Sequence, residues 1–406
     1  PWAHTYPHLA RPGPQGDFLK EALGWWDRRL KGWQNMAENI PRVRLYLQDS
    51  AAPQTSYDHR SGQWVGFDRW PPDEVEMRQW AVSNDALSPS SAIPSRSCAP
   101  VSLSTPLANA YHGPEWLPHG VGPELPPDQS IEDSGALCFD SEVLSEPLLL
   151  CGAPGLNLRL RASSAGALQV RLVDLRPDGS AARMTYAVLN LNHHLGLSDP
   201  MPMSVNEWIT VSLHMDSMAQ VIPAGHRLRL AISTQAWPLI WPAARNMRIE
   251  VATESIRLHL PVLNRTPETL EQDKANEVVL SPPPLSLVWE RPVRRDRKMV
   301  TDQNGWTERT YLKDDGAYRI DEHGMTADAR GLLTYRSFRD DPLSAEASYG
   351  YQIRHSRDHW NVTVECDLRV SCNAQQFLVN GDFRALEDGE LVADRPVAFK
   401  VRRRWV

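Results

Sequence analysis

Residues 156–172 read LNLRLRASSAGALQVRL, and this stretch decides the fold class. Leucine or valine alternates with a polar residue at 156–161 and again at 168–172, and small residues separate the two runs. Successive side chains of a β-strand point to opposite faces of its sheet, so each run predicts a strand with one face buried and one in water. The stretch therefore predicts two neighbouring strands of a mainly β protein.

The same alternation recurs on both sides of this stretch. It predicts strands at 42–47, 63–67, 247–251 and 256–260, and a Pro-Ala-Gly turn at 223–225 leads into another at 227–232. Residues 83–106 have loop composition and are expected to form a long surface excursion. Many short strands joined by turns are typical of a β-sandwich or jelly roll.

A polar, proline-rich connection after Pro261 leads to a further region in which apolar and polar residues alternate at 360–370 and 397–401. The pattern predicts a β-rich, long-stranded extension. Cys366 and Cys372 are an even number of residues apart, so we expect both on one apolar face, as core residues.

One long helical pattern lies near the amino end. Apolar residues recur at three- and four-residue spacing from Phe18 to Leu30, Asp17 precedes them as a capping residue, and Gly32 follows as a stop. We therefore expect three regions: residues 1–38, residues 39–263 as the β-sandwich, and residues 264–406 as the extension. We expect the helix face with Trp26 and Leu30 to be an exposed apolar surface that promotes aggregation of the isolated chain.

Composition excludes several classes of protein. The 406 residues carry a formal charge of -7, with acids and bases interspersed, which argues against a nucleic-acid or acidic-membrane partner. There is no apolar run of membrane-spanning length and no signal-peptide pattern, so a cytoplasmic location is expected. The five cysteines are odd in number and lack metal-site spacing, which indicates neither a disulfide framework nor a zinc ribbon.

The histidines outside the first residues have structural interpretations. His355 and His359 bracket a predicted hairpin turn, so no metal site is expected there. His193 and His194 follow a strand, and adjacent strand residues point to opposite faces. His226 is expected to stabilise its turn, and His8 to support the loop at the amino end.

The amino end itself resembles a catalytic motif. The run Pro1-Trp2-Ala3-His4 is similar to the Gly-Pro-Trp-x-His motif of the CocE/NonD hydrolases, a family that includes cocaine-esterase-like enzymes and X-Pro dipeptidyl-peptidases. The run from Val221 to Ser233, with Trp237-Pro238 behind it, resembles the signature of that family's carboxy-terminal jelly roll, a galactose-binding-like sandwich. Segments 128–140 and 172–191 match the same domain, so the resemblance covers roughly residues 1–262 in order.

The resemblance implies a serine hydrolase that cleaves an ester or amide by acyl transfer, with His4 as the general acid and base. The nucleophile elbow G-x-S-x-G precedes this histidine in such enzymes, and residues 162–166, Ala-Ser-Ser-Ala-Gly, lack its first glycine. We therefore expect the chain to be the carboxy-terminal part of a larger hydrolase, inactive alone, whose partner is the α/β-hydrolase portion with the Ser and Asp. The missing initiator Met at position 1 agrees with that expectation.

The expected substrate is a small ester or peptide, and no cofactor or metal is expected. Trp2, Trp237 and Trp241 are the candidate substrate-binding residues, because aromatic side chains line pockets for apolar groups, although core packing is the alternative for each. Two other interpretations stay open: a non-catalytic module that binds carbohydrate or another ligand, and a split enzyme whose other chain supplies Ser and Asp.

Overall fold

A computed structural model describes residues 1–35, 40–89, 99–266 and 285–405 of the chain. These residues form two compact units. The first unit contains residues 1–105 and 112–235 and the chain from Met247 to residue 266, within the described ranges. The second contains residues 106–111, 236–246 and the chain from residue 285 onward. The predicted boundaries at 38 and 263 stay a prediction, and residues 1–35 lie in the first unit.

The first unit is a β-sandwich, as the sequence predicts. Its strands are β1 (Val43–Gln48), β2 (Gly62–Phe67), β3 (Val75–Ser83), β4 (Ala86–Pro89), β5 (Val101–Leu103), β6 (Leu137–Ser141), β7 (Leu148–Gly152), β8 (Gly155–Ala162), β9 (Ala167–Leu175), β10 (Ala181–Asn190), β11 (Ile209–His214), β12 (Met218–Ile222), β13 (Arg227–Ser233) and β14 (Ile249–Leu263).

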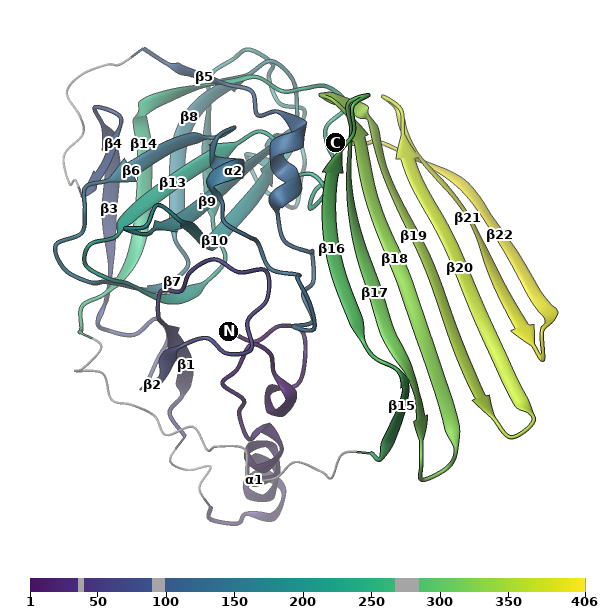
Figure 1. Ribbon diagram of the computed structural model, residues 1–406. Coiled ribbons are helices and arrows are strands. Elements are labelled where there is room, and N and C mark those ends of the chain that lie inside the picture. Colours follow the sequence, from purple (N-terminus) through teal and green to yellow (C-terminus); the bar gives the residue numbers. More distant parts are fainter. Residues whose placement is uncertain (36–39, 90–98, 267–284, 406) are drawn as a thin grey trace. The chain divides into compact units, whose positions relative to one another are not determined.

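Most of these strands lie on one hydrogen-bonded path that ends in β14-β7-β12-β1-β2, while β5, β8 and β11 lie off this path (Figure 1). The path runs β10-β9-β13-β6-β4-β3-β14, and β8 joins β11 to β14. The larger core cluster contains side chains from strands on and off this path, among them Leu158 of β8 and Val170 of β9, and a smaller cluster contains Leu47 of β1 and Val65 of β2. Full burial of such a side chain stabilises the fold by about 1.5 to 3 kcal/mol. The alternation at 156–161 and 168–172 thus predicted two strands whose apolar faces lie in the core.

The outer face of β9 differs from the expectation. Gln169 and Arg171 were expected in water, but both are buried. A short helix, α2 (Ser130–Asp133), provides the reason, since Glu132 and Asp133 lie 3.2 and 2.9 Å from the Arg171 guanidinium. Gln129 accepts a further hydrogen bond from Arg171 at 2.8 Å. A buried charge is tolerated when it is paired in this way.

The predicted surface excursion at 83–106 is wrong in part. The structure forms β4 and β5 within it, β4 pairing with β3 and β6 and β5 with β14. These strands are only four and three residues long, too short for a periodic pattern to reveal them. Residues 90–98 of this segment lie outside the described residues.

Helix α1 (Phe18–Lys31) is confirmed with both of its end signals. The Asp17 carboxylate accepts a hydrogen bond from the Lys20 amide at 3.3 Å, and Gly32 ends the helix at φ +71°. No residue of α1 is buried, however, so its apolar face is not core within the first unit. An ion pair between Glu21 and Arg44 connects the helix to β1.

The remaining short helices are 3-10 turns: η1 (Pro7–Leu9), η3 (Leu107–His112) and η4 (Leu191–His193). His193 and His194 follow strand β10, as the sequence predicts, and lie at the end of the 3-10 turn η4. The turn before β13 is confirmed, with Gly225 at φ +87°. Among the described residues, no helix is both long and apolar enough to span a membrane.

The second unit is an antiparallel sheet of long strands, as predicted (Figure 1). Its strands are β15 (Leu287–Arg291), β16 (Arg294–Thr301), β17 (Trp306–Ile320), β18 (Met325–Phe338), β19 (Asp341–Arg357), β20 (Trp360–Cys372), β21 (Gln376–Glu387) and β22 (Glu390–Arg402).

Strands β17 to β22 follow one another as hairpins in chain order. The predicted turn between His355 and His359 is confirmed, since Asp358 adopts φ +53° between β19 and β20. Cys366 and Cys372 are only partly buried, which corrects the expectation of core residues. Their strand, β20, belongs to a sheet in which most described residues are partly exposed on both faces. The alternation of apolar and polar residues along β20 therefore does not imply full burial of the apolar ones.

Candidate functional site

His4 lies on an irregular loop at the start of the first unit. Its backbone amide donates to Pro118 O at 2.8 Å, and the neighbouring Ala3 amide donates to Arg11 O at 3.1 Å. A second loop, residues 118–124, thus fixes the backbone that presents the imidazole. The position of His4 is therefore set by contacts on both sides of the residue.

A buried carboxylate orders that second loop. Glu124 accepts hydrogen bonds from the amides of His119 at 2.7 Å and Gly120 at 2.8 Å, and its side chain is buried. Gly120 has φ +77°, and a Cβ atom there would lie 2.3 Å from Arg11 O. Only glycine allows this approach of the two loops, since any other residue would be both strained and in collision.

The His4 imidazole is exposed. Its ring meets the ring of His119 edge-on, with centroids 5.5 Å apart and an interplanar angle of 87°. Among the described residues, no group forms a hydrogen bond to the imidazole nitrogens. Both nitrogens are thus available to a proton donor or acceptor that approaches from outside these residues, which is the state that acid–base chemistry requires of a histidine.

Trp2 lies two residues before His4 and is 37% exposed. Its indole nitrogen donates to Pro14 O at 2.6 Å, and its ring packs at 5.6 Å from Trp64 of β2. The ring also lines a cavity of about 320 Å³ in the first unit. Of the predicted substrate-binding residues, Trp2 is the one that this cavity includes.

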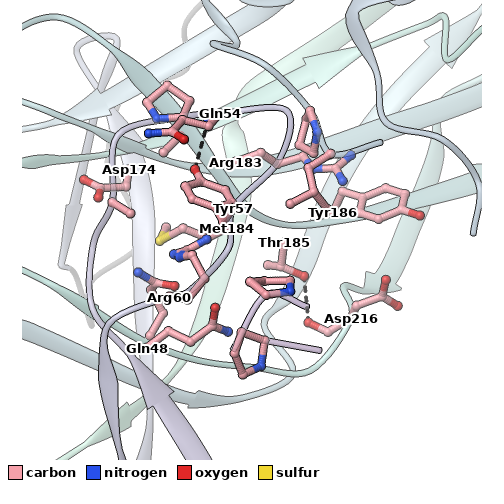
Figure 2. A pocket seen from close by; sticks show the side chains of 18 of the residues that line it. Gln48, Gln54, Tyr57, Arg60, Asp174, Arg183, Met184, Thr185, Tyr186 and Asp216 are labelled. Carbon is pink, nitrogen blue, oxygen red and sulfur yellow. Dashed lines mark hydrogen bonds between the residues drawn. The ribbon is translucent and has the colours of Figure 1, made fainter. Parts of the chain in front are cut away.

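The cavity has a polar lining with aromatic walls (Figure 2). Gln48, Gln54, Arg60, Asp174 and Arg183 contribute polar groups, and the following side chains contribute rings or apolar surface: Trp2, Pro12, Pro53, Tyr57, Pro126, Met184 and Tyr186. Figure 2 shows the dashed hydrogen bond between Gln54 and Tyr57, which joins the Gln54 amide to the Tyr57 hydroxyl at 2.9 Å. His4 is not among the lining residues.

Trp237 and Trp241 lie in the second unit, in an aromatic cluster. The ring of Trp237 is 4.9 Å from Trp241, 5.5 Å from Tyr335 and 6.4 Å from Tyr111, and only 1% of this residue is exposed. The Trp241 indole donates to Cys372 Sγ at 3.3 Å. This geometry is that of core packing, the alternative for these two tryptophans, and no described cavity includes either ring.

The other histidines occupy structural positions. His226 is buried, and its Nδ1 lies 2.7 Å from Asp174 Oδ1, so it joins the turn before β13 to the end of β9. The His8 ring stacks on Phe18, with centroids 6.4 Å apart, and connects the loop to α1. Within the described ranges, no group of three or more His, Cys, Asp or Glu side chains is arranged to hold a metal ion.

Helix α1 carries a stripe of exposed apolar side chains close to this loop in the sequence. Leu19, Leu23, Trp26 and Leu30 recur at four-, three- and four-residue spacing, which places them on one face. Their exposed fractions run from 39% to 74%. A contiguous apolar face of this kind marks an interaction surface.

Sequence reasoning missed the residues that position His4. His119 and Glu124 lie more than a hundred residues away along the chain, and only the glycine at position 120 signalled a special turn there. It also missed Arg60 and Arg183, which the fold brings to the cavity from separate segments.

Comparison with known proteins identifies a family and several relatives. Residues 35–280 match the sequence family described as the X-Pro dipeptidyl-peptidase C-terminal non-catalytic domain. The cocaine esterase of Rhodococcus sp. (strain MB1 Bresler) is 24% identical over 235 residues, which are 53% of this chain and 37% of that protein.

Two solved structures are also similar. The first is an aminopeptidase from the marine sediment archaeon Thaumarchaeota archaeon, with 17% identity and a TM-score of 0.46 over 60% of this chain and 43% of that one. The second, a CocE/NonD family hydrolase from Staphylococcus aureus, has 12% identity and a TM-score of 0.44 over 60% of this chain and 45% of that one. The chain thus spans less than half the length of each of these proteins. On the family match over most of its length, the chain belongs to the X-Pro dipeptidyl-peptidase C-terminal domain family, the carboxy-terminal domain of CocE/NonD-type hydrolases.

Proposed function

We propose that the chain is the carboxy-terminal portion of a serine hydrolase that cleaves an ester or amide, with His4 as the general acid and base. The observation that carries the proposal is the exposed imidazole of His4, held on a loop with a fixed backbone and with no hydrogen bond to its nitrogens from the described residues. The Ser nucleophile and the Asp that orients the imidazole come from a segment that precedes Pro1. The substrate is a small ester or peptide, and the protein acts in the cytoplasm.

The proposed chemistry places two demands on His4. A neutral imidazole takes the proton of the serine hydroxyl during attack on the carbonyl, and the imidazolium then returns it to the leaving group. Both transfers require the ring nitrogen to lie within roughly 3 Å of the partner oxygen or nitrogen. The hydrogen bond from the His4 amide to Pro118 fixes the backbone for this task and leaves the ring free to meet the nucleophile.

The apolar stripe of α1 supports the same proposal. Leu23 and Leu30 are more than half exposed, although an amphipathic helix normally buries its apolar face. The catalytic portion would cover this stripe and bring its Ser to the His4 loop. Removal of the stripe from water would contribute to association at about 25 cal/mol per Å² of apolar surface.

Labelling with a fluorophosphonate, which forms a covalent bond to activated serines, tests this assignment. We expect the chain expressed with its upstream coding sequence to be labelled at one serine before Pro1, and residues 1–406 alone to remain unlabelled. Mass spectrometry of the labelled peptide locates the serine. Labelling of a serine within residues 1–406, or an upstream sequence without any reactive serine, would contradict the proposal.

The binding-module interpretation gives a different outcome in the same experiment. A non-catalytic glycan-binding protein would show no labelled serine in either form, and it would be retained on an immobilised oligosaccharide. A split enzyme would be labelled only after a second chain is added. Serine labelling, together with retention on the oligosaccharide, therefore distinguishes the three interpretations.

A further inference from the structure

The cavity of the first unit contains two guanidinium groups with unmet hydrogen-bonding capacity. Arg60 precedes β2 and Arg183 lies on β10, and both line the space of about 320 Å³ (Figure 2). A cavity of this size lies at the lower end of the range for small-molecule sites. His4 is not one of the residues that line this cavity.

Of the two guanidinium groups, that of Arg183 has fewer partners among the described residues. Its guanidinium lies over the Tyr186 ring, 4.3 Å from the centroid, as Figure 2 shows. Within the described residues it forms no hydrogen bond or ion pair, although the side chain is partly buried. Burial lowers the pKa of Arg183 from its ordinary value, with a smaller opposing effect from Glu132. The charged group is therefore poorly compensated in this structure.

The Arg60 guanidinium also lies over an aromatic ring. Its guanidinium lies 4.8 Å from the centroid of the Tyr57 ring and donates to Asp49 O at a long distance of 3.3 Å. Its Nε is buried and has no hydrogen-bond partner in the described structure. A buried donor without a partner is unfavourable, and a ligand that accepts the hydrogen bond removes this penalty.

The two acidic residues of the lining do not neutralise these cations. Asp174 accepts hydrogen bonds from His226 at 2.7 Å and Ser50 at 2.6 Å, so both of its oxygens are engaged elsewhere. Asp216 is exposed and forms no ion pair with Arg183 within 4.0 Å. The two guanidinium groups of the cavity thus lack a closely bound counter-ion from the described residues.

We propose that this cavity binds a small carboxylate with an apolar or aromatic body, which pairs with Arg183. Planar guanidinium groups match carboxylates bidentately, and stacking on an aromatic ring fixes their orientation. The rings of Trp2, Tyr57 and Tyr186 and the neighbouring prolines supply the apolar walls for the body of the ligand. The inference goes beyond the proposed hydrolase function, since it needs neither His4 nor an upstream serine.

Isothermal titration of residues 1–406 with benzoate tests the site. We expect saturable binding, with a dissociation constant of about 1 mM or below. Benzyl alcohol, which keeps the ring and lacks the charge, is expected to bind at least about tenfold more weakly. Inorganic phosphate distinguishes a site for any anion from one that also recognises the apolar body, and it is expected to bind more weakly than benzoate.

Two variants assign the binding to the cavity. Arg183→Gln is expected to weaken benzoate binding about tenfold or more, and Arg183→Lys by a smaller factor, since lysine keeps the charge and loses the planar fork. Arg159→Gln is the matched control, because Arg159 also lies over an aromatic ring, at 5.8 Å from Trp208, but is exposed and outside the cavity.

Equal affinity of Arg183→Gln and the unaltered chain for benzoate would overturn the proposal. So would the absence of benzoate binding, or equal affinity for benzoate and benzyl alcohol, a comparison that needs no variant. Phosphate binding that equals or exceeds benzoate binding would overturn the apolar part of the assignment. None of these results depends on hydrolytic activity, so failure here is distinct from failure of the proposed function.

Discussion

At the scale of single residues, buried charge distinguishes this sandwich from one held by apolar packing alone. Arg171 lies at the centre of a buried cluster with Glu132 and Asp133, and Asp133 also pairs with Arg229 at 2.8 Å. Such a cluster contributes little net stability when complete, but removal of one partner takes a compensating charge away from groups that stay buried. Arg171 is therefore a position where a single substitution has a large cost.

We expect Arg171→Met to lower the free energy of unfolding by about 3 kcal/mol or more, since the buried ion pairs of Arg171 with Glu132 and Asp133 would both be lost. Urea unfolding followed by tryptophan fluorescence measures the loss. Arg161→Met is the control: Arg161 pairs with Glu250 at 2.7 Å on the surface, and its removal is expected to cost below about 1 kcal/mol. Equal losses in the free energy of unfolding from the two substitutions would show that burial of the Arg171 cluster does not increase the cost of removing its arginine.

Two cysteines provide a prediction about pH. Burial raises the pKa of Cys151 from 9.0 to about 11, and burial with the Asp133 charge raises that of Cys138 to about 12. At pH 7.5 fewer than about one thiol in a thousand is then ionised, and the thiolate is the reactive form. We expect neither residue to react with iodoacetamide in the folded protein within an hour, and both to react once urea unfolds it.

Peptide mass spectrometry gives the extent of modification at each cysteine. The raised pKa values also fix the sign of the pH effect on stability. Well below pH 9 both thiols are neutral in the folded and the unfolded chain. As the pH rises through about 9, the unfolded chain loses protons that the folded chain keeps, so the contribution of the thiols to stability falls. Rapid labelling of Cys138 or Cys151 in the folded protein would contradict their raised pKa values.

At the scale of elements, the local pattern predicted those elements that one buried face defines. Strand β8 keeps the predicted alternation because Leu156, Leu158 and Leu160 face the core. Helix α1 was predicted with its caps because Asp17 and Gly32 act within one turn of its ends. These signals depend on residues that are close together in the sequence, so they can be recognised without the tertiary structure.

The pattern did not predict what depends on distant neighbours. Arg171 reads as a solvent-facing strand residue until α2 covers it, and the short strands β4 and β5 exist because β3 and β14 lie beside them. In the site, the resemblance identified His4, but the loop that holds it required Glu124 and Gly120. The cavity joins Arg60 and Arg183, which no periodicity relates.

Helix α1 carries the prediction at this scale. We expect residues 1–406 alone to self-associate or bind a hydrophobic dye through the exposed stripe, because Trp26 is 53% and Leu30 is 74% exposed. Trp26→Lys with Leu30→Lys should reduce dye fluorescence and shift light scattering toward the monomer.

The pair Leu195→Lys with Leu197→Lys is the matched control, since both leucines are exposed but lie in a loop after η4 and outside any helix stripe. It is expected to change neither measurement. A monodisperse, dye-negative chain without any substitution would contradict the assignment of the stripe as an interaction surface.

At the scale of the whole molecule, the family assignment and the site have to be considered together. The matched family is a non-catalytic domain, and the match begins at residue 35, after the loop with His4 and after α1. The residues before the match carry the chemistry proposed here, and those within it form the sandwich that holds them in place through Pro118 and Glu124. The proposed division of labour is thus between a catalytic histidine and the domain that fixes its backbone.

The turnover of a p-nitrophenyl ester by the chain joined to its upstream coding sequence tests this division most directly. We predict that His4→Ala lowers kcat/KM by about four orders of magnitude or more, because a triad acts as a unit. His359→Ala, in the exposed turn between β19 and β20, should leave the rate unchanged. Hydrolysis by the His4→Ala enzyme at the rate of the His359→Ala control would contradict the account.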